Sequence, residues 1–257
     1  MAGFRFASLG SGSKGNAWVV QAGLTTVLVD CGFGPREATR RLARLGLAAE
    51  NLGAILVTHE HSDHGRGVAR LAAMARCPVW LSLGSHAMLE AQGAAPVSAN
   101  ILSGQDVFAL GDLEIAPYPV PHDAREPVHF TFFDGVRRFG LLTDAGHVTP
   151  QIEAALGDCS ALALECNHDL GLLQAGNDPA ALKRRILGPY GHLDNTAAAA
   201  LLGRVGGTGL THVVAAHLSE RNNAPELART ALAGALGCDD AWIGVADQET
   251  GLDWRDI

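Results

Sequence analysis

The chain has 257 residues, a formal net charge of −8 and 47% hydrophobic residues. This length and apolar content suffice for one large folded core, while the acidic charge argues against a protein that coats nucleic acid nonspecifically. No apolar run approaches the roughly 18 residues of a membrane-spanning helix, so we expect no membrane partner.

Two features of the sequence predict a cytoplasmic protein. The first residues, MAGFRFASLG, lack the basic stretch followed by an apolar stretch that marks a secretion signal. The five cysteines are odd in number, scattered along the chain and free of CxxC pairs. Such cysteines are typical of free thiols in a reducing compartment.

Short apolar runs bounded by Gly, Pro or Asp predict strands, and helical patterns intervene between them. The predicted strands cover residues 4–9, 16–21, 25–30, 53–58, 77–82, 106–110, 113–120, 128–133, 138–143, 161–166, 211–216 and 242–247. The predicted helices cover residues 35–46, 67–75, 85–92, 150–157, 178–187, 194–205 and 224–236, with Ser85 and Asp194 as candidate N-caps. Since no linker or composition break interrupts this order, we predict one α/β domain over residues 1–257, with sheets covered by helices.

The first connection, GSGSKGN at residues 10–16, has the composition of a phosphate-binding loop but not its pattern. A P-loop reads GxxxxGK[ST] and leads into a helix, whereas here Lys14 precedes Gly15 and an apolar strand pattern follows. Two interpretations stay open. The segment is either a hairpin turn whose glycines supply positive φ, or a nest of amides in which Ser13 and Lys14 help to hold a substrate anion.

The segment THEHSDH, at residues 58–64, carries the strongest chemical signal. His59 and His61 stand two positions apart at the end of a strand, so their side chains project to the same side. Asp63 and His64 follow in the turn that begins the next helix. Imidazole and carboxylate ligands together suit Zn, Mn or Fe. The cluster therefore predicts a metal site.

Further ligand candidates follow other predicted strands. His122 comes after LEIAPYPVP, Asp144 ends RFGLLTD and His217 ends THVVAAH. His122 or His217 taken alone is as often a structural turn residue, but as members of a set at successive strand ends they are predicted ligands. A carboxylate between two cations about 3.5–4 Å apart can bridge them, which suits Asp144.

The pattern HxHxDH in HEHSDH resembles the metallo-β-lactamase fold, a four-layer αββα sandwich with a two-metal site at one rim. With it, the segments SLGSGSKGN, LVDCG, PHDAREPV, TDAGHV, ECNHD, RRILGPYGHLDN and HLSERNN resemble, in this order, the YycJ/WalJ group of that superfamily, which are relatives of ribonuclease Z. The resemblance implies that fold and two divalent ions of Zn, Mn or Fe.

The resemblance also implies roles for single residues. The implied ligands are His59, His61 and His122 for one metal ion, Asp63, His64 and His217 for the other, and Asp144 as the bridge. Asp30 in LVDCG would orient a histidine, although capping a turn is an equal alternative. His192 in GHLDN resembles the histidine that lies near the scissile phosphate in ribonuclease Z. Asn167 and His168 in ECNHD are candidate residues of the rim that contact the substrate.

The implied reaction is hydrolysis by a hydroxide that bridges the two metal ions, with Asp63 and His192 as catalytic acid–base residues. Within this family the YycJ/WalJ resemblance favours a DNA exonuclease over a tRNA-processing enzyme, because no long glycine-rich and basic insertion interrupts the strands. We therefore expect a nucleic acid substrate, with DNA favoured over RNA. Cys31 and Cys166 lie beside site residues without the histidine and acid that a thiol nucleophile needs, so we expect both to be buried apolar side chains.

Two basic clusters are candidates for contact with a phosphate backbone. Arg36, Arg40 and Arg44 form a stripe on one predicted helix, with Arg41 beside it, and Lys183, Arg184 and Arg185 cluster on another. A solvated helix face is the favoured alternative for both clusters, because Glu37 interrupts the first and the net charge is acidic.

Other hydrolases on the same scaffold remain as alternatives. A thioester or lactone hydrolase would use the same dinuclear site. Asp144 as a bridge argues against a β-lactam specialist, and His61 argues against a redox flavodiiron relative, which carries Glu at that position.

Overall fold

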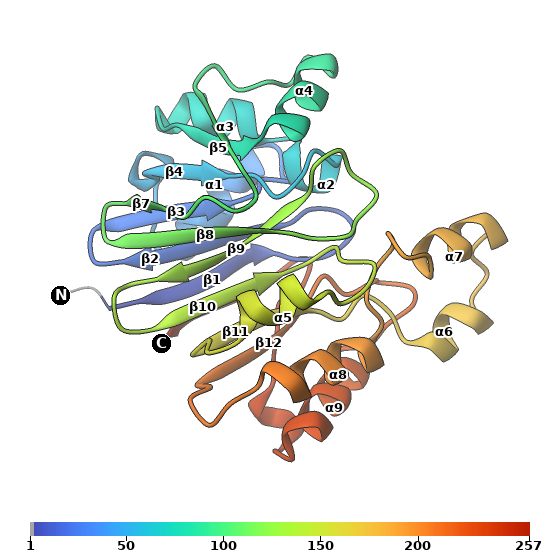
Figure 1. Cartoon of the computed structure of the whole chain (residues 1–257). Coiled ribbons are helices and arrows are strands. Elements are labelled where there is room, and N and C mark those ends of the chain that lie inside the picture. The colour runs from blue at the N-terminus through green and yellow to red at the C-terminus, as the bar shows by residue number, and fades with distance from the viewer. Residues whose placement is uncertain (1–2) are drawn as a thin grey trace.

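The computed structural model describes residues 3–257 and folds into two β-sheets packed face to face (Figure 1). The first sheet contains β1 (Arg5–Gly10), β2 (Ala17–Ala22), β3 (Thr25–Val29), β4 (Ala54–Leu56), β5 (Val79–Ser82), β6 (Ala99–Leu102) and β14 (Leu252–Asp256), in the order β14-β1-β2-β3-β4-β5-β6. The second contains β7 (Phe108–Leu110), β8 (Leu113–Pro119), β9 (Val128–Phe133), β10 (Arg138–Leu142), β11 (Ala161–Glu165), β12 (His212–Ala216) and β13 (Gly244–Val245), in the order β13-β12-β11-β10-β9-β8-β7.

The two sheets repeat one pairing scheme. In the first sheet β1, β2 and β3 pair antiparallel, and the strands from β3 to β6 then pair parallel. In the second sheet the strands from β7 to β10 pair antiparallel, and those from β10 to β13 pair parallel. The carboxyl ends of parallel strands meet at one edge of a sheet, which is where binding sites form in such folds.

Helices cover the outer face of each sheet. Those beside the first sheet are α1 (Pro35–Arg44), α2 (Ser62–Gly65), α3 (Val68–Ala75) and α4 (Leu83–Ala91), and those beside the second are α5 (Pro150–Leu156), α8 (Asn195–Val205) and α9 (Pro225–Leu236). Two short helices, α6 (Leu170–Ala175) and α7 (Ala180–Ile186), lie apart from these layers (Figure 1). Within residues 3–257, no helix has the length and apolarity to cross a bilayer.

Successive side chains along a strand point to opposite faces of the sheet, and this alternation explains the four layers. In β1, Phe6 faces the opposite sheet and its ring stacks on Phe139 with centroids 4.2 Å apart, while the next residue, Ala7, faces the outer helices. In β3, Val27 also faces inward and Leu28 outward. Because both faces of these strands are apolar, each sheet needs cover on both sides. The predicted αββα sandwich is confirmed.

All the predicted strands and helices correspond to elements of the structure, but the strands β6 and β14, the helices α2 and α6, and two short 3-10 helices (Ala49–Asn51 and Asp240–Trp242) were not predicted. The strands β6 and β14 are half-exposed and carry polar residues, and α6 is too short for a helical period. Ser85 is wrong as the N-cap of α4, because the helix starts earlier and the Ser82 side chain accepts a hydrogen bond from the Ser85 N–H. Asp194 is confirmed as the N-cap of α8.

Candidate metal centre

The site residues lie beyond the ends of strands along one rim of the sandwich. Asp30 follows β3, His59 follows β4 after a short link, and His122 follows β8. Asp144 lies two positions after the end of β10, and His217 follows β12 directly. Residues separated by up to 187 positions therefore meet because the strands that carry them end at the same edge.

Three histidines form the first group of donor atoms. The Nδ1 of His61 lies 3.1 Å from the Nε2 of His59 and 3.3 Å from the Nε2 of His122. His59 and His122 are buried and His61 is half-buried. Three imidazole nitrogens that converge on one point suit a divalent transition metal.

A second group lies beside the first and combines a carboxylate with two imidazoles. The Oδ2 of Asp63 lies 3.6 Å from the Nε2 of His64 and 3.7 Å from the Nε2 of His217. One donor atom from each of the three residues falls within 4.8 Å of the others. The spacing suits a second cation of the same kind.

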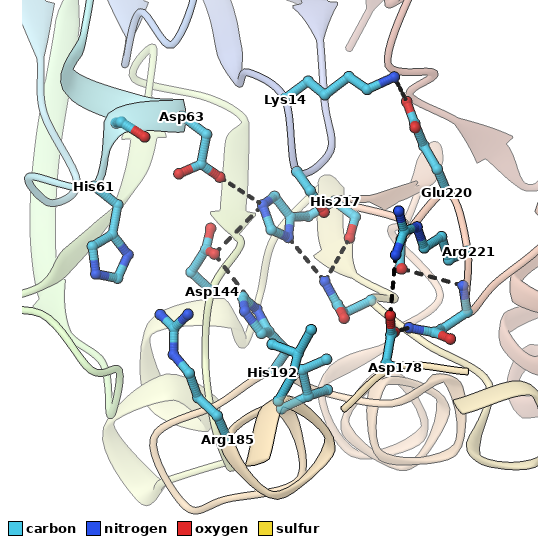
Figure 2. A pocket seen from close by; sticks show the side chains of 17 residues that line it. Lys14, His61, Asp63, Asp144, Asp178, Arg185, His192, His217, Glu220 and Arg221 are labelled. Atoms are coloured by element: carbon cyan, nitrogen blue, oxygen red, sulfur yellow. Dashed lines mark hydrogen bonds and ion pairs between the residues drawn. The ribbon is translucent and has the colours of Figure 1, made fainter. Parts of the chain in front are cut away.

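Asp144 lies between the two groups. Its Oδ2 is 3.1 Å from the Nε2 of His64, and its Oδ1 is 3.9 Å from the Nε2 of His122. The Oδ1 also lies 3.5 Å from the Nε2 of His217 (Figure 2). A single carboxylate thus contacts donors from both groups, which is the position that a bridging ligand would take.

Unsatisfied atoms in the site fit bound divalent metal. The Oδ2 of Asp144 and the Nε2 of His217 are buried, and neither forms a hydrogen bond of acceptable geometry with any of residues 3–257. A buried polar atom without a partner costs about 1–3 kcal/mol. These atoms lie within the converging donor groups, so a cation there would satisfy them. Nitrogen and carboxylate donors together suit Zn, Mn or Fe.

The buried charges move the pKa values of the site in opposite directions. Burial, with the neighbouring histidines, lowers the pKa of His59 well below its usual value. Burial alone would lower the pKa of His217, but the carboxylates of Asp144, Asp63 and Glu165 raise it to about 10. Metal binding must displace such protons, so we expect it to release protons and to weaken at low pH.

Three site residues adopt a left-handed backbone conformation. Asp30, Asp144 and His217 have φ of 61°, 52° and 55°, and they are three of the five non-glycine residues with positive φ among residues 3–257. This conformation is strained for most side chains and gathers at functional sites. Here it turns the chain sharply at three strand ends, so that the side chains face the centre.

The predicted anion nest at residues 10–16 is wrong, because amides of the turn already donate to oxygens of the protein. The N–H of Gly12 donates to the Oδ1 of Asn16, and the N–H of Lys14 donates to the Oε1 of Gln248. The turn instead supports the metal-binding segment. The Asn16 N–H donates to the Asp63 carbonyl at 2.8 Å, and its Nδ2 lies 3.1 Å from the Nε2 of His64.

Replacing Asn16 with Ala is expected to lower the free energy of unfolding by about 1–3 kcal/mol and the metal affinity by about 10- to 100-fold, because the Asn16 amide pairs buried groups of the turn and contacts His64. Denaturant titration and competition with a chelator measure the two effects. Asn51→Ala is the control, since Asn51 caps an exposed turn through the Ala48 N–H. If Asn16→Ala lost stability but kept full metal affinity, Asn16 would support only the turn.

Glu165, which sequence reasoning missed, holds two histidines of the site. Its Oε1 lies 2.7 Å from the Nδ1 of His192 and 3.5 Å from the Nδ1 of His217, while its Oε2 accepts the Ala145 N–H at 2.8 Å. Burial alone would raise the pKa of Glu165, but the charge and hydrogen bond of His192 lower it to about 2. The available signal was an acid that ends the otherwise apolar strand ALALE.

Asp30 orients His64. Its Oδ2 lies 2.8 Å from the Nδ1 of His64, and its carboxylate also accepts the N–H and hydroxyl of Thr58. This leaves the Nε2 of His64 to face Asp144. Thr58, which anchors the carboxylate, was not predicted from the sequence.

A cavity of about 580 Å³ opens over the centre (Figure 2). Ser13, Lys14 and Asn167 line it, as does His192. His168, the other candidate rim residue, does not line this cavity. It is only 1% exposed, forms an isolated bridge with Asp194, and lies beside a neighbouring hollow that His192 also lines, so its contact with the substrate stays a prediction.

The predicted arginine stripe on α1 does not form a track for phosphates. Arg41 is 6% exposed and donates to the carbonyls of Leu9 and Gln248. Arg44 donates to the Ser8 carbonyl, and Arg40 pairs with Glu37. The guanidinium groups of Arg41 and Arg44 thus fasten α1 to β1 and to the Gln248 segment, and that of Arg40 pairs within the helix.

Cys31 and Cys166 are fully buried, as predicted. Burial raises the pKa of the Cys31 thiol to about 12 and also raises that of Cys166. Neither thiol is therefore ionised as a nucleophile near neutral pH.

The chain is similar to known proteins of one family in sequence and in fold. Residues 25–218 match the family described as "Beta-lactamase superfamily domain". The chain is 36% identical to "Exodeoxyribonuclease YycJ" of Bacillus anthracis, over 95% of the chain and 93% of that protein. It is 32% identical to "Exodeoxyribonuclease WalJ" of Streptococcus pneumoniae, over 95% and 92%. The crystal structure of "the metallo-beta-lactamase fold protein YhfI" from Bacillus subtilis shares the fold, with a TM-score of 0.77 at 14% identity over the whole of both chains.

Proposed function

The chain belongs to the beta-lactamase superfamily as a metal-dependent hydrolase related to the exodeoxyribonucleases YycJ and WalJ, and from this premise we propose that it is a two-metal phosphodiesterase that degrades DNA from an end. The observation that carries the proposal is the pairing of Glu165 with His192 beside the shared carboxylate of Asp144. This arrangement places a proton donor, His192, beside a site for two cations. We also propose that the protein is cytoplasmic, since the cysteines are free and DNA is the substrate.

Divalent cations, when bound to the two donor groups, would neutralise charge on the phosphate and make water more acidic. The chain's own residues supply the rest. Asp63 is half-buried and lines the cavity, where its carboxylate can accept a proton from the attacking water. The Nδ1 of His192 is held by Glu165, which leaves the Nε2 to carry a proton to the departing oxygen. Ser13, Lys14 and Asn167 are the proposed contacts for the rest of the substrate.

The electrostatics of His192 suit a proton donor. Burial alone would lower its pKa, but the charge and hydrogen bond of Glu165 and the charge of Asp144 outweigh burial and raise it. Both carboxylates therefore favour the imidazolium form, which a general acid requires.

A hydrolase of thioesters or lactones is the second candidate function. A thiolate leaves readily without a proton, whereas the sugar oxygen of a DNA strand is a poor leaving group that gains from protonation. The Glu165–His192 pair would add little to thioester hydrolysis, and this difference favours the phosphodiester.

The proposal is tested with metal-depleted protein reloaded with Zn²⁺ or Mn²⁺. End-labelled duplex DNA, single-stranded DNA, RNA of the same sequence and closed circular DNA serve as substrates, beside a thioester and a lactone. We expect stepwise shortening of linear DNA and no cleavage of the circle. Asp63→Ala is expected to abolish turnover without changing the circular dichroism spectrum. Rapid thioester hydrolysis with every nucleic acid left intact would refute the proposal.

A further inference from the structure

The helix α7 carries a guanidinium into the cavity over the candidate metal centre. It has no buried residue and lies with α6 apart from the two helical layers (Figure 1). Arg185, near its end, extends toward the centre, with His61, Asp144 and His192 around it (Figure 2). The preceding residue, Arg184, is exposed and does not line the cavity, so of the predicted basic cluster at 183–185 only Arg185 reaches the site.

Asp123 holds this guanidinium from the side. Its Oδ2 accepts the Nε–H of Arg185 at 2.5 Å and its Oδ1 accepts an Nη2–H at 3.2 Å. The Asp123 backbone N–H donates to the Tyr190 carbonyl at 3.0 Å, which fixes the loop that carries the carboxylate. This pairing uses the Nε and Nη2 of Arg185. The Nη1 forms no hydrogen bond with the described part of the chain and keeps its donors for a ligand.

The Asp123–Arg185 pair is poorly explained as a stabilising contact. The Arg185 side chain is 56% exposed and that of Asp123 is 31% exposed, and pairs of this kind add little to stability. The Oδ1 of Asp123 is also 3.4 Å from the Nε2 of His122. Metal cations bound at the centre would repel a guanidinium beside it, and the Asp123 carboxylate offsets that repulsion.

The other cations of the cavity are engaged on its far side. The Nζ of Lys14 lies 2.8 Å from Glu220, and the Nη1 of Arg221 lies 3.2 Å from Asp178 (Figure 2). Arg185 is the cation drawn beside Asp144 and His192, where the reacting phosphate would lie. Planar guanidinium groups bind phosphate oxygens through two donors in a fixed geometry.

We propose that Arg185, positioned by Asp123, binds a non-bridging oxygen of the substrate phosphate through its Nη1 donors and so selects anionic phosphodiesters. This inference rests on the proposed function. The Asp123 carboxylate acts as a positioning group, because it sets the plane of the guanidinium and leaves one edge open.

The test compares kcat and KM for linear DNA among four metal-loaded proteins: the unmodified protein, Arg185→Ala, Arg185→Lys and the matched control Arg184→Ala. We expect Arg185→Ala to lower kcat/KM by about 10- to 100-fold, which is the usual effect of losing a charge-assisted hydrogen bond. Arg185→Lys should fall between, since lysine keeps the charge but cannot pair side-on. Arg184→Ala should stay within about threefold of the unmodified protein, because surface substitutions away from a site change little.

A double-mutant cycle tests the positioning role of Asp123. Asp123→Asn should lower kcat/KM on its own and have no further effect when Arg185 is already Ala. Metal content and melting temperature are measured for each protein, because Asp123 adjoins the ligand candidate His122. Additive effects, or a loss that follows lost metal, would overturn the positioning role.

The outcomes separate this inference from the proposed function. If the unmodified protein cleaves DNA and Arg185→Ala matches Arg184→Ala, the Arg185 inference alone is overturned. If the unmodified protein leaves DNA intact, the proposed function fails and the inference fails with it.

Discussion

Replacing Asp144 with Asn is expected to lower kcat/KM for DNA by about 10³-fold, equivalent to about 4 kcal/mol of transition-state stabilisation. Asp144 contacts donors from both metal-binding groups, through its Oδ2 to His64 and its Oδ1 to His217 and His122. Asparagine has almost the same size and tolerates the left-handed backbone at φ 52°, so the change removes mainly the charge.

Metal content, measured by mass spectrometry, should fall together with activity in Asp144→Asn, because an amide binds divalent cations more weakly than a carboxylate does. Asp158→Asn is the matched control, since Asp158 is an exposed aspartate with φ 59° in a turn after α5. It should keep both metal and turnover. An Asp144→Asn protein with full metal content and unchanged turnover would show that the two cations do not share this carboxylate.

The sandwich could be predicted from sequence because the residue pattern of its strands indicates burial on both faces of each sheet. Strands such as β3 are apolar on successive residues, which indicates burial on both sides, and glycine or aspartate marks their ends. β14 escaped prediction because only one of its five residues, Leu252, is buried, and its acidic and basic residues obscure the strand pattern.

The ligand candidates were predictable because metal-binding side chains are rare in such clusters and follow strand ends. Their supporting residues were not. Glu165 lies in a strand far from His192 in the chain, and Asn16 lies in a turn 47 positions before Asp63; only the folded sheets bring these partners together. The burial of Arg41 could not be predicted either, since its hydrogen-bond acceptors are the carbonyls of Leu9 and Gln248, which only the fold brings near it.

Replacing His192 with Gln is expected to lower DNA cleavage at neutral pH by about 10²- to 10⁴-fold, the usual contribution of a general acid. The Nδ1 of His192 is bound by Glu165, and a glutamine in its place has no proton that it can transfer to the departing oxygen. With a p-nitrophenyl phosphodiester the loss should be less than about tenfold, because p-nitrophenolate leaves without protonation. Equal losses on both substrates would mean that His192 positions the substrate rather than protonating it.

The pH profile of Glu165→Gln tests whether the Glu165 carboxylate keeps His192 protonated. Burial lowers the pKa of His192, but Glu165 and Asp144 raise it above its usual value, so the donor is charged at low pH and is lost as the pH rises through the raised pKa. Removing the Glu165 charge lowers that pKa, and the alkaline limb of kcat should therefore move to lower pH. Glu153→Gln, which removes an exposed partner of Arg204, should leave the limb in place. An alkaline limb that did not move in Glu165→Gln would refute the view that this buried carboxylate keeps His192 protonated.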